Sequence, residues 1–427
     1  MRSVKSTVSG RGIAGAAAAV LALAIASGVA AKTVTLNVWS VDGYSPNREV
    51  FIKAVQDFEK AHPGIRIKVN YGDWVTLSEK FLTATAGGAA PDLFNTNLGG
   101  NGELVWGNLF RALDPYISKD RVKKSDYIES TLDALTVDGK LYGLPTHTDA
   151  RGIIFNKALF AKAGLDTNAG PKTWDDLKEY QMKLTQKPDG RNFSQVGILP
   201  FAGEAAWIFQ WGWMLGGSSW DVKEARYTLE NPKNVQALKY LISLATVFGP
   251  EFLANGPKVG GIAGGKVAME VGGSWYLPYL AKSAKGLQFG VYDLPYPVEG
   301  VRATLGGGFA WSIARGSKRP DEAWQFVKWM AGYEGQTRLF PGIGAVPANL
   351  AAQKHVFAEV DANAKAFFEM TSYVKQFPNY PGSLKLLTAQ GPNIMAAYQG
   401  KLQPEEALKR SQVEAQRLWT AVAKRKK

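Results

Sequence analysis

The chain has 427 residues, a formal net charge of +13 at pH 7 and no cysteine. The lack of cysteine excludes a disulfide scaffold, a thiolate metal site and a cysteine nucleophile. A basic chain first suggests nucleic-acid binding. Its lysines and arginines, however, are scattered among acidic residues, apart from one dense cluster at 424–427. We therefore predict no nucleic-acid partner, and the length suffices for two domains.

The first 31 residues have the pattern of a secretory signal peptide. Three basic residues come before an apolar run at 13–26, and small residues follow at 27–31. We place cleavage near Ala31, with cleavage one residue earlier as the alternative. The apolar run is short for a membrane-spanning helix, and no other apolar stretch reaches that length. We predict an exported protein of the periplasm without a lipid anchor, because no cysteine can carry one.

The next part of the chain alternates strands and helices. Residues 33–39, 65–71 and 92–95 have the alternation or the β-branched composition of strands. One helix begins at Ser45 and Pro46, which suit an N-cap and a first helical turn. A second helix covers 76–86. This order of elements predicts a parallel sheet with helical crossovers.

The rest of the chain is longer and more helical. No low-complexity linker separates two halves, which suggests two lobes joined by crossings of the chain. The predicted elements are short strands at 140–145 and 152–156, a helix at 173–185 that opens on a capping box, a helix at 231–248, a helix followed by a strand within 258–271, a strand at 308–314, a helix at 320–330, and further helix after that except at 340–347.

Several short motifs occur in a fixed order along the chain. They are FLTATAGGAAPDL at 81–93, LYGLP at 141–145, IFNKALF at 154–160, AGL at 163–165, PKTWDDL at 171–177, GG at 216–217, GGKVAM at 264–269, GSW at 273–275, GGG at 306–308 and WQFVKW at 324–329. Together these motifs resemble extracellular solute-binding proteins of carbohydrate-uptake ABC transporters, the maltose-binding-protein-like family. Two departures, a His-Thr pair before Asp149 and Phe155 where the family often carries Tyr, leave the sugar open.

The resemblance implies an α/β fold of two lobes with a ligand cleft and a hinge between them. It also implies capture of a carbohydrate by hinge closure and delivery to the membrane permease of an ABC importer, by a monomer without a cofactor or a metal. The implied division is 32–148 and 305–342 for the N-terminal lobe, 149–304 and 343–427 for the C-terminal lobe, with crossings near 147–152, 302–306 and 342–346.

A sugar site needs flat aromatic rings for the C–H faces and planar polar groups for the hydroxyls. In open α/β sheets such sites lie beyond the carboxyl ends of the strands. This rule selects Trp39 and Asp42 after the first strand, Trp74 after the second, and Asn95 and Asn97 after the third. The alternatives are a core position for Trp39 and turn or loop roles for the polar residues.

The first crossing carries two charged candidates. We expect Asp149 to accept hydrogen bonds from two adjacent hydroxyls, since charge-assisted bonds are strong. Arg151 is either a ligand contact or half of a structural ion pair. His147 is expected to be a loop residue without ligand contact. If it joins Arg151 at the ligand, an anionic sugar is favoured. In the second lobe, Trp275 follows a strand and two glycines and is the best candidate for a ring platform.

Two further candidates have an explicit alternative. Trp207 and Trp211 share one face of a helix, so one of them should be core; Trp211 is taken as a ligand contact. Gly307 and Gly308 lie in a glycine triplet, where backbone N–H groups can approach a ligand. The triplet is equally compatible with a flexible hinge.

The main rival function is an exported glycoside hydrolase, which needs two carboxylates facing each other across a sugar. Asp42, Asp149 and Glu270 are available, but no hydrolase motif or metal motif is present and only three histidines occur. A purely structural surface protein does not account for the motifs at the lobe crossings. We therefore predict a binder without catalytic residues, whose ligand is a sugar or, alternatively, a polyol or an anionic sugar derivative.

Overall fold

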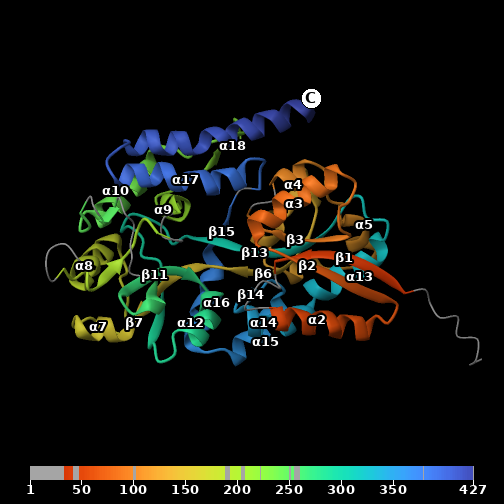
Figure 1. Ribbon diagram of the computed structural model, residues 1–427, viewed down its shortest axis with the longest axis horizontal. Coiled ribbons are helices and arrows are strands. Elements are labelled where there is room, and N and C mark those ends of the chain that lie inside the picture. The colour runs from red at the N-terminus through yellow and green to blue at the C-terminus, as the bar shows by residue number, and fades with distance from the viewer. Residues whose placement is uncertain are drawn as a thin grey trace, which may run out of the picture.

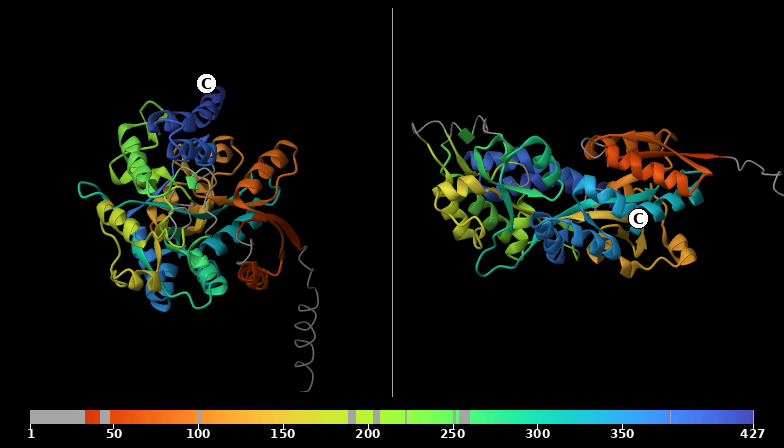
Figure 2. Two further views of the ribbon diagram at one scale, coloured as in Figure 1. Left: turned by 60° about the vertical axis from the view of Figure 1, so that its left-hand side comes forward. Right: turned by 90° about the horizontal axis from the view of Figure 1, so that it is seen from below.

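The structure is a computed structural model that describes residues 33–41, 48–99, 102–187, 193–202, 207–221, 223–249, 252–253, 260–377 and 379–426. The predicted signal peptide at 1–31 lies outside these residues. Within the described ranges, no helix combines the length and the apolar character that a membrane span requires. The chain forms two α/β lobes that lie end to end along the long axis of the molecule (Figures 1 and 2).

Lobe one is built on a mixed sheet with the strand order β14-β6-β13-β3-β1-β2, and β15 is added to one end of β13. β1 pairs in parallel with β2 and with β3, which confirms the parallel arrangement predicted from the sequence. The strands are β1 (Val34–Ser40), β2 (Ile65–Tyr71), β3 (Leu93–Asn97), β6 (Leu144–Asp149), β13 (Thr304–Ile313), β14 (Val346–Pro347) and β15 (Val374–Gln376), with a small hairpin of β4 (Thr136–Val137) and β5 (Lys140–Leu141).

Helices cover both faces of this sheet. Successive residues of a strand point to opposite faces, so neighbouring residues of one strand pack against different helices. Leu93 packs into the cluster formed with α2 and α13, and its neighbour Phe94 packs into the cluster formed with α3 and α4. The helices of lobe one are α2 (Arg48–Ala61), α3 (Trp74–Ala86), α4 (Gly102–Trp106), α5 (Asp114–Asp120), α6 (Glu129–Asp133), α13 (Pro320–Ala331) and α14 (Tyr333–Ile343).

Lobe two is built on a four-stranded sheet with the order β12-β7-β11-β8. β7 is antiparallel to both neighbours, and β11 pairs in parallel with β8. Ile153 and Phe155 face the main core of this lobe, whereas Ile154 faces a second cluster on the other side. The strands are β7 (Arg151–Asn156), β8 (Val196–Ile198), β11 (Val267–Gly273) and β12 (Phe289–Asp293), with a separate pair of β9 (Trp220–Asp221) and β10 (Arg226–Tyr227).

Long C-terminal helices complete lobe two. α17 and α18 pack against each other and run along one side of the lobe (Figure 1). The helices of this lobe are α7 (Lys157–Lys162), α8 (Trp174–Leu184), α9 (Ile208–Met214), α10 (Pro232–Ala245), α12 (Tyr276–Ser283), α15 (Leu350–Glu359), α16 (Ala362–Met370), α17 (Ser383–Tyr398) and α18 (Pro404–Lys426).

At three places along the described chain, residues that are close in sequence belong to different hydrophobic clusters. Leu144 lies in the core of lobe one and Ile153 in the core of lobe two. On β13, Leu305 belongs to the lobe-two core and Ala310 to the lobe-one core. After α14, residues 345 and 346 fall in different clusters. These are the places where the chain passes between the two sheets.

The structure corrects two predictions of secondary structure. Residues 340–343, expected outside helix, form the last turn of α14, which ends where Gly344 adopts φ = 68° and donates its N–H to the carbonyl of Phe340. Residues 374–376, expected within helix, form β15. A three-residue strand has no periodicity to detect, and this one exists because it pairs with β13.

Gly308 lies at the middle of β13 and has a backbone conformation that other residue types rarely adopt. Its φ is +112°, and a Cβ would lie 2.2 Å from the carbonyl oxygen of His147. A Gly308→Ala variant should therefore lose at least about 2 kcal/mol in its free energy of unfolding, measured by urea denaturation. Gly316→Ala is the matched control, since a Cβ there meets nothing within 4 Å. Equal stability of the two variants would contradict this account.

Candidate ligand-binding site

Asp149 and Arg151 form a buried ion pair at the first crossing between the lobes. Asp149 ends β6 and Arg151 begins β7, and their residues are 7% and 6% exposed. The Nη1 atom of Arg151 donates to Oδ1 of Asp149, and also to the carbonyl of Leu305 at 3.2 Å. The pair thus links the end of one sheet, the start of the other and the strand that both lobes share.

Hydrogen bonds also fix the backbone around this pair. The N–H of Arg151 donates to Oγ1 of Thr304 at 2.9 Å, and the Thr304 hydroxyl donates to the Arg151 carbonyl at 2.8 Å. Burial raises the pKa of the Asp149 carboxyl above its usual value, while the charge of Arg151 and the backbone N–H of Gly307 act in the opposite direction. The side chains are therefore preorganised, because none of them must be ordered when a ligand arrives.

Two indole rings contact the guanidinium of Arg151. Its Cζ atom lies 4.8 Å from the ring centroid of Trp275 and 5.4 Å from that of Trp207. Trp275 follows β11, and a Cβ on Gly273 would lie 1.7 Å from the Trp275 ring. Only glycine at 273 lets this ring fold back over the end of the strand, beside Arg151. Rings and charges of both signs therefore gather at one place.

Trp211 has to be withdrawn from the candidate contacts. It lies in the middle of α9, is 0% exposed and packs against Trp174 and Tyr240, with ring centroids 6.1 and 6.2 Å away. Trp207, the N-cap of the same helix, is half-buried and contacts Arg151. Sequence reasoning expected one of the two in the core and chose the wrong one. The available signal was position, because Trp207 precedes the helix whereas Trp211 lies within its apolar run.

The two glycines also have a structural explanation. A Cβ on Gly307 would lie 2.8 Å from Oδ1 of Asp149 and 2.9 Å from Nη1 of Arg151, and one on Gly308 would meet the backbone of β6. Their backbones therefore approach the protein's own ion pair and its neighbouring strand. We no longer assign them to direct ligand contact, and the close packing explains why both positions lack a side chain.

In lobe one, the structure uses Asn95 for the sheet itself. Its side chain is 1% exposed, Oδ1 accepts from the N–H of Val41 at 3.4 Å, and Nδ2 donates to the carbonyl of Ala310 at 3.4 Å. Both ends of the amide thus join neighbouring strands. Asn95 is corrected from a ligand contact to a structural residue, because its side chain points into the lobe rather than beyond the strand end.

Trp39 and Asn97 keep their places at strand ends. Trp39 is half-buried and meets Phe81 edge to face, with ring centroids 6.4 Å apart. Asn97 is the last residue of β3, and its Oδ1 accepts the N–H of Gly99 at 2.8 Å. Neither residue is tied completely into the core, so both stay predicted contacts.

Asp42 and the side chain of Trp74 lie outside the described residues. The backbone of Trp74 begins α3, whose N-cap Asp73 accepts the N–H of Thr76 at 2.9 Å. Both residues stay predictions from the sequence. Among the residues that the structure does describe, no group of three His, Cys, Asp or Glu side chains could hold a metal ion.

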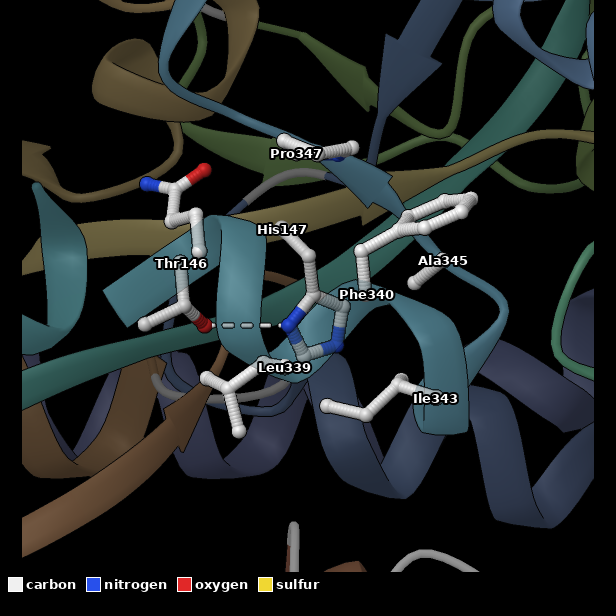
Figure 3. Close-up of a pocket in the computed structure, with 8 residues that line it drawn as sticks. Thr146, His147, Leu339, Phe340, Ile343, Ala345 and Pro347 are labelled. Carbon is white, nitrogen blue, oxygen red and sulfur yellow. Dashed lines mark hydrogen bonds between the residues drawn. The ribbon is translucent and has the colours of Figure 1, made fainter. Parts of the chain in front are cut away.

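His147 faces a small pocket beside the third crossing (Figure 3). The Thr146 hydroxyl donates to the carbonyl of Phe309 at 2.9 Å, so it accepts from Nδ1–H of His147 at 3.0 Å. The pocket holds about 10 Å³, room for one water molecule but not for a sugar. It is lined by Thr146, His147, Gln336, Leu339, Phe340, Ile343, Ala345 and Pro347.

Comparison with known proteins identifies a matching family and several related binding proteins. Residues 44–337 match the model of the bacterial extracellular solute-binding protein family. A putative binding protein of Brucella abortus (strain 2308) is 26% identical over 406 residues, covering 93% of this chain and 95% of that protein. The arabinooligosaccharide-binding protein of Bacillus subtilis (strain 168) is 25% identical over 336 residues, covering 73% of this chain and 72% of that protein.

Solved structures agree with the fold. The structure of CpMnBP1 with mannotriose bound superposes with a TM-score of 0.79 at 28% identity, covering 90% of this chain and 100% of that one. An ABC substrate-binding protein of Listeria monocytogenes in complex with cycloalternan gives a TM-score of 0.78 at 22% identity, covering 90% and 98%. The two-lobed architecture described above is therefore shared with these proteins.

The buried His147 predicts a pH dependence of stability. Burial lowers its pKa from 6.5 to about 4. As the pH falls from about 6.5 to 4, the unfolded chain therefore binds a proton that the folded chain does not, and stability falls. The loss between pH 7 and pH 4.5 should be about 2–3 kcal/mol from this group.

Urea unfolding of His147→Asn tests this prediction, because the amide can still donate to Thr146 but does not titrate. The variant should lose less stability than wild type on acidification. His355→Asn changes an exposed histidine on α15 and should keep the wild-type dependence. An unchanged dependence in the His147 variant would mean that His147 is protonated as easily in the folded protein as in the unfolded chain.

Proposed function

Because the chain belongs to the family of bacterial extracellular solute-binding proteins, we propose that it captures a carbohydrate between its lobes and delivers it to the permease of an ABC importer. One observation carries this proposal. A preorganised ion pair with two indole rings, Asp149 and Arg151 with Trp207 and Trp275, lies where the chain crosses between the lobes. Rings that accept C–H faces beside a carboxylate that accepts hydroxyls suit a sugar.

The charges of this site favour a neutral ligand. The positive charge of Arg151 is already paired with Asp149, and burial keeps His147 neutral at pH 7 by lowering its pKa to about 4. His147 also lines the small pocket beside the third crossing, and Arg151 is not among the residues that line it. The combination of His147 and Arg151 that would favour an anionic sugar is therefore not formed. Names of relatives such as the arabinooligosaccharide-binding protein support a neutral saccharide of one or more units.

The rival glycoside hydrolase loses support. Glu270 accepts the N–H of Ile262 at 2.7 Å and the hydroxyl of Tyr276 at 3.5 Å. Alternation along β11 places it on the face opposite to Gly273 and the Trp275 ring. Asp149 is paired with Arg151. No two described carboxylates among the candidates thus face each other across a shared space, and the relatives named above are binding proteins.

The working cycle follows from the two lobes. We assign 32–148 and 305–342 to the N-terminal lobe and 149–304 and 343–427 to the C-terminal lobe. The separate cores near the crossings support this division, although β14 and β15 pair with the sheet of lobe one and Leu305 packs into the core of lobe two. The ligand binds the closed form more tightly than the open form and so shifts the equilibrium toward closure. The permease recognises the closed pair of lobes. The protein acts as an exported monomer in the periplasm after removal of residues 1–31.

A ligand panel tests the proposal. The mature protein is heated with neutral mono-, di- and oligosaccharides, sugar acids and polyols, and the midpoint of unfolding is recorded. A neutral saccharide at 100 times its Kd should add about 2.7 kcal/mol of stability. The same compound should be recovered unchanged. Hydrolysis of it would instead support the enzyme, and stabilisation by sugar acids alone would contradict the neutral ligand.

Two substitutions test the site with the saccharide found in this way. Trp275→Ala should weaken binding about tenfold, because it removes an aromatic platform. Asp149→Asn keeps the shape but removes the charge and should also weaken binding, measured by calorimetric titration. Trp329→Ala changes a half-buried tryptophan of lobe one outside the candidate site and is the control. Wild-type affinity in both site variants would refute the assignment.

A further inference from the structure

Arg151 has more partners than a simple ion pair requires. Its guanidinium donates to Asp149 at the end of β6 and to the carbonyl of Leu305 on β13. It also lies over the rings of Trp207, the N-cap of α9, and Trp275, which follows β11. These partners come from four segments that are far apart in the sequence. One side chain therefore joins four other parts of the protein at a single point.

The two indole rings at this point differ from the tryptophans of the core. Trp211 packs against the rings of Trp174 and Tyr240, with centroids 6.1 and 6.2 Å away. Trp207 and Trp275 are half-buried, and no aromatic ring of the described residues packs on either of them in this way. Their shared flat partner is the guanidinium of Arg151, whose Cζ atom lies 5.4 Å and 4.8 Å from the two ring centroids.

The shape of the guanidinium suits this double task. The group is planar, so it can donate hydrogen bonds in its plane while its faces lie against aromatic rings. The two N–H groups of Nη1 have acceptors in Asp149 and Leu305, and the Arg151 side chain is only 8% exposed. Little of its surface is left for a ligand, whereas the two half-buried rings beside it remain partly accessible.

We propose that Arg151 is a positioning residue, which holds the rings of Trp207 and Trp275 in place as platforms and makes no contact with the ligand itself. A ring that is already held in its place does not have to be ordered when the ligand binds. Loss of the guanidinium therefore weakens binding through the two rings. The effect of Arg151 on affinity rests on the proposed function, whereas its effect on the rings does not.

Arg151→Lys separates the flat contacts from the charge. A lysine can still pair with Asp149, which avoids an unpaired buried charge, but its ammonium group is compact and has no planar face. Arg338→Lys is the matched control in lobe one. The guanidinium of Arg338 lies 5.4 Å from the ring centroid of Trp329 and pairs with Asp57 at 3.4 Å, outside the candidate site.

Fluorine NMR of protein labelled with fluorotryptophan reports the surroundings of each ring without any ligand. Trp207→Phe and Trp275→Phe assign the two resonances by their loss. Arg151→Lys should shift or broaden both resonances and leave the other tryptophan signals in place. Arg338→Lys should change the signal of Trp329 and neither of these two. An unchanged signal of Trp207 or Trp275 in Arg151→Lys would overturn the proposal.

Trp275→Phe also gives a second measurement, which does not depend on the stability of Arg151→Lys. This variant keeps Arg151 and replaces one of the two rings by a smaller one. Because one guanidinium contacts both rings, the resonance of Trp207 should shift as well. If that resonance keeps its wild-type position, the two rings are not held through a common group and the proposal is wrong.

A double-mutant cycle with the saccharide found above tests the lack of ligand contact. Arg151→Lys should weaken binding about tenfold, measured by calorimetric titration. In a background with both Trp207→Ala and Trp275→Ala, the same substitution should change the affinity by less than about twofold, because the rings that Arg151 positions are gone. A direct contact would instead cost the same factor in both backgrounds and would exclude a positioning role. All variants are compared below their measured melting midpoints.

The two measurements separate this inference from the proposed function. If no saccharide binds but both indole resonances respond to Arg151→Lys, Arg151 positions the rings and the carbohydrate assignment fails. If a saccharide binds and Arg151→Lys weakens its binding equally with and without the two rings, the proposed function stands and the positioning role fails.

Discussion

The arrangement of both lobes depends on one strand. β13 pairs with β3 and β6 over the part that lies in lobe one and with β15 at its other end. Leu305 and Ala310, five residues apart on this strand, belong to different hydrophobic cores. The partners change at the glycine triplet, where Gly308 has a positive φ. The glycine triplet thus marks the place on this strand where both its pairing partners and its hydrophobic core change.

The same strand explains how two charges are kept away from water. A buried charge costs several kcal/mol unless it is paired and its remaining polar atoms are satisfied. Arg151 meets Asp149 and the carbonyl of Leu305, and Asp149 also accepts from the backbone of Gly307. The ion pair therefore needs β13 in its present place, and the glycine at 307 leaves the room for it. A ligand that enters beside this pair finds charges and rings that are already ordered.

Many elements could be predicted from the sequence because their causes are local. The alternation of residues 65–71 gave β2 without error, and the capping box at Thr173 begins α8 as expected. The errors occurred where a distant partner decides. β15 is a strand only because β13 offers it hydrogen bonds. Asn95 lies near the carboxyl end of a strand, where ligand contacts are expected. Its side-chain amide instead forms hydrogen bonds with the backbone of Val41 and Ala310, which no local pattern reveals.

The sequence by itself determined the α/β order of elements, the family resemblance and the choice of Asp149, Arg151 and Trp275 as candidates, since periodicity, capping and motif order are properties of neighbouring residues. Only the tertiary structure decided that Trp211 is core, that Trp207 accompanies Arg151, and that Trp106 reaches across to lobe two. A tryptophan gains from burial in a core, in a site or between lobes alike. Which of these it occupies depends on the elements that pack around it, and those come from distant parts of the chain.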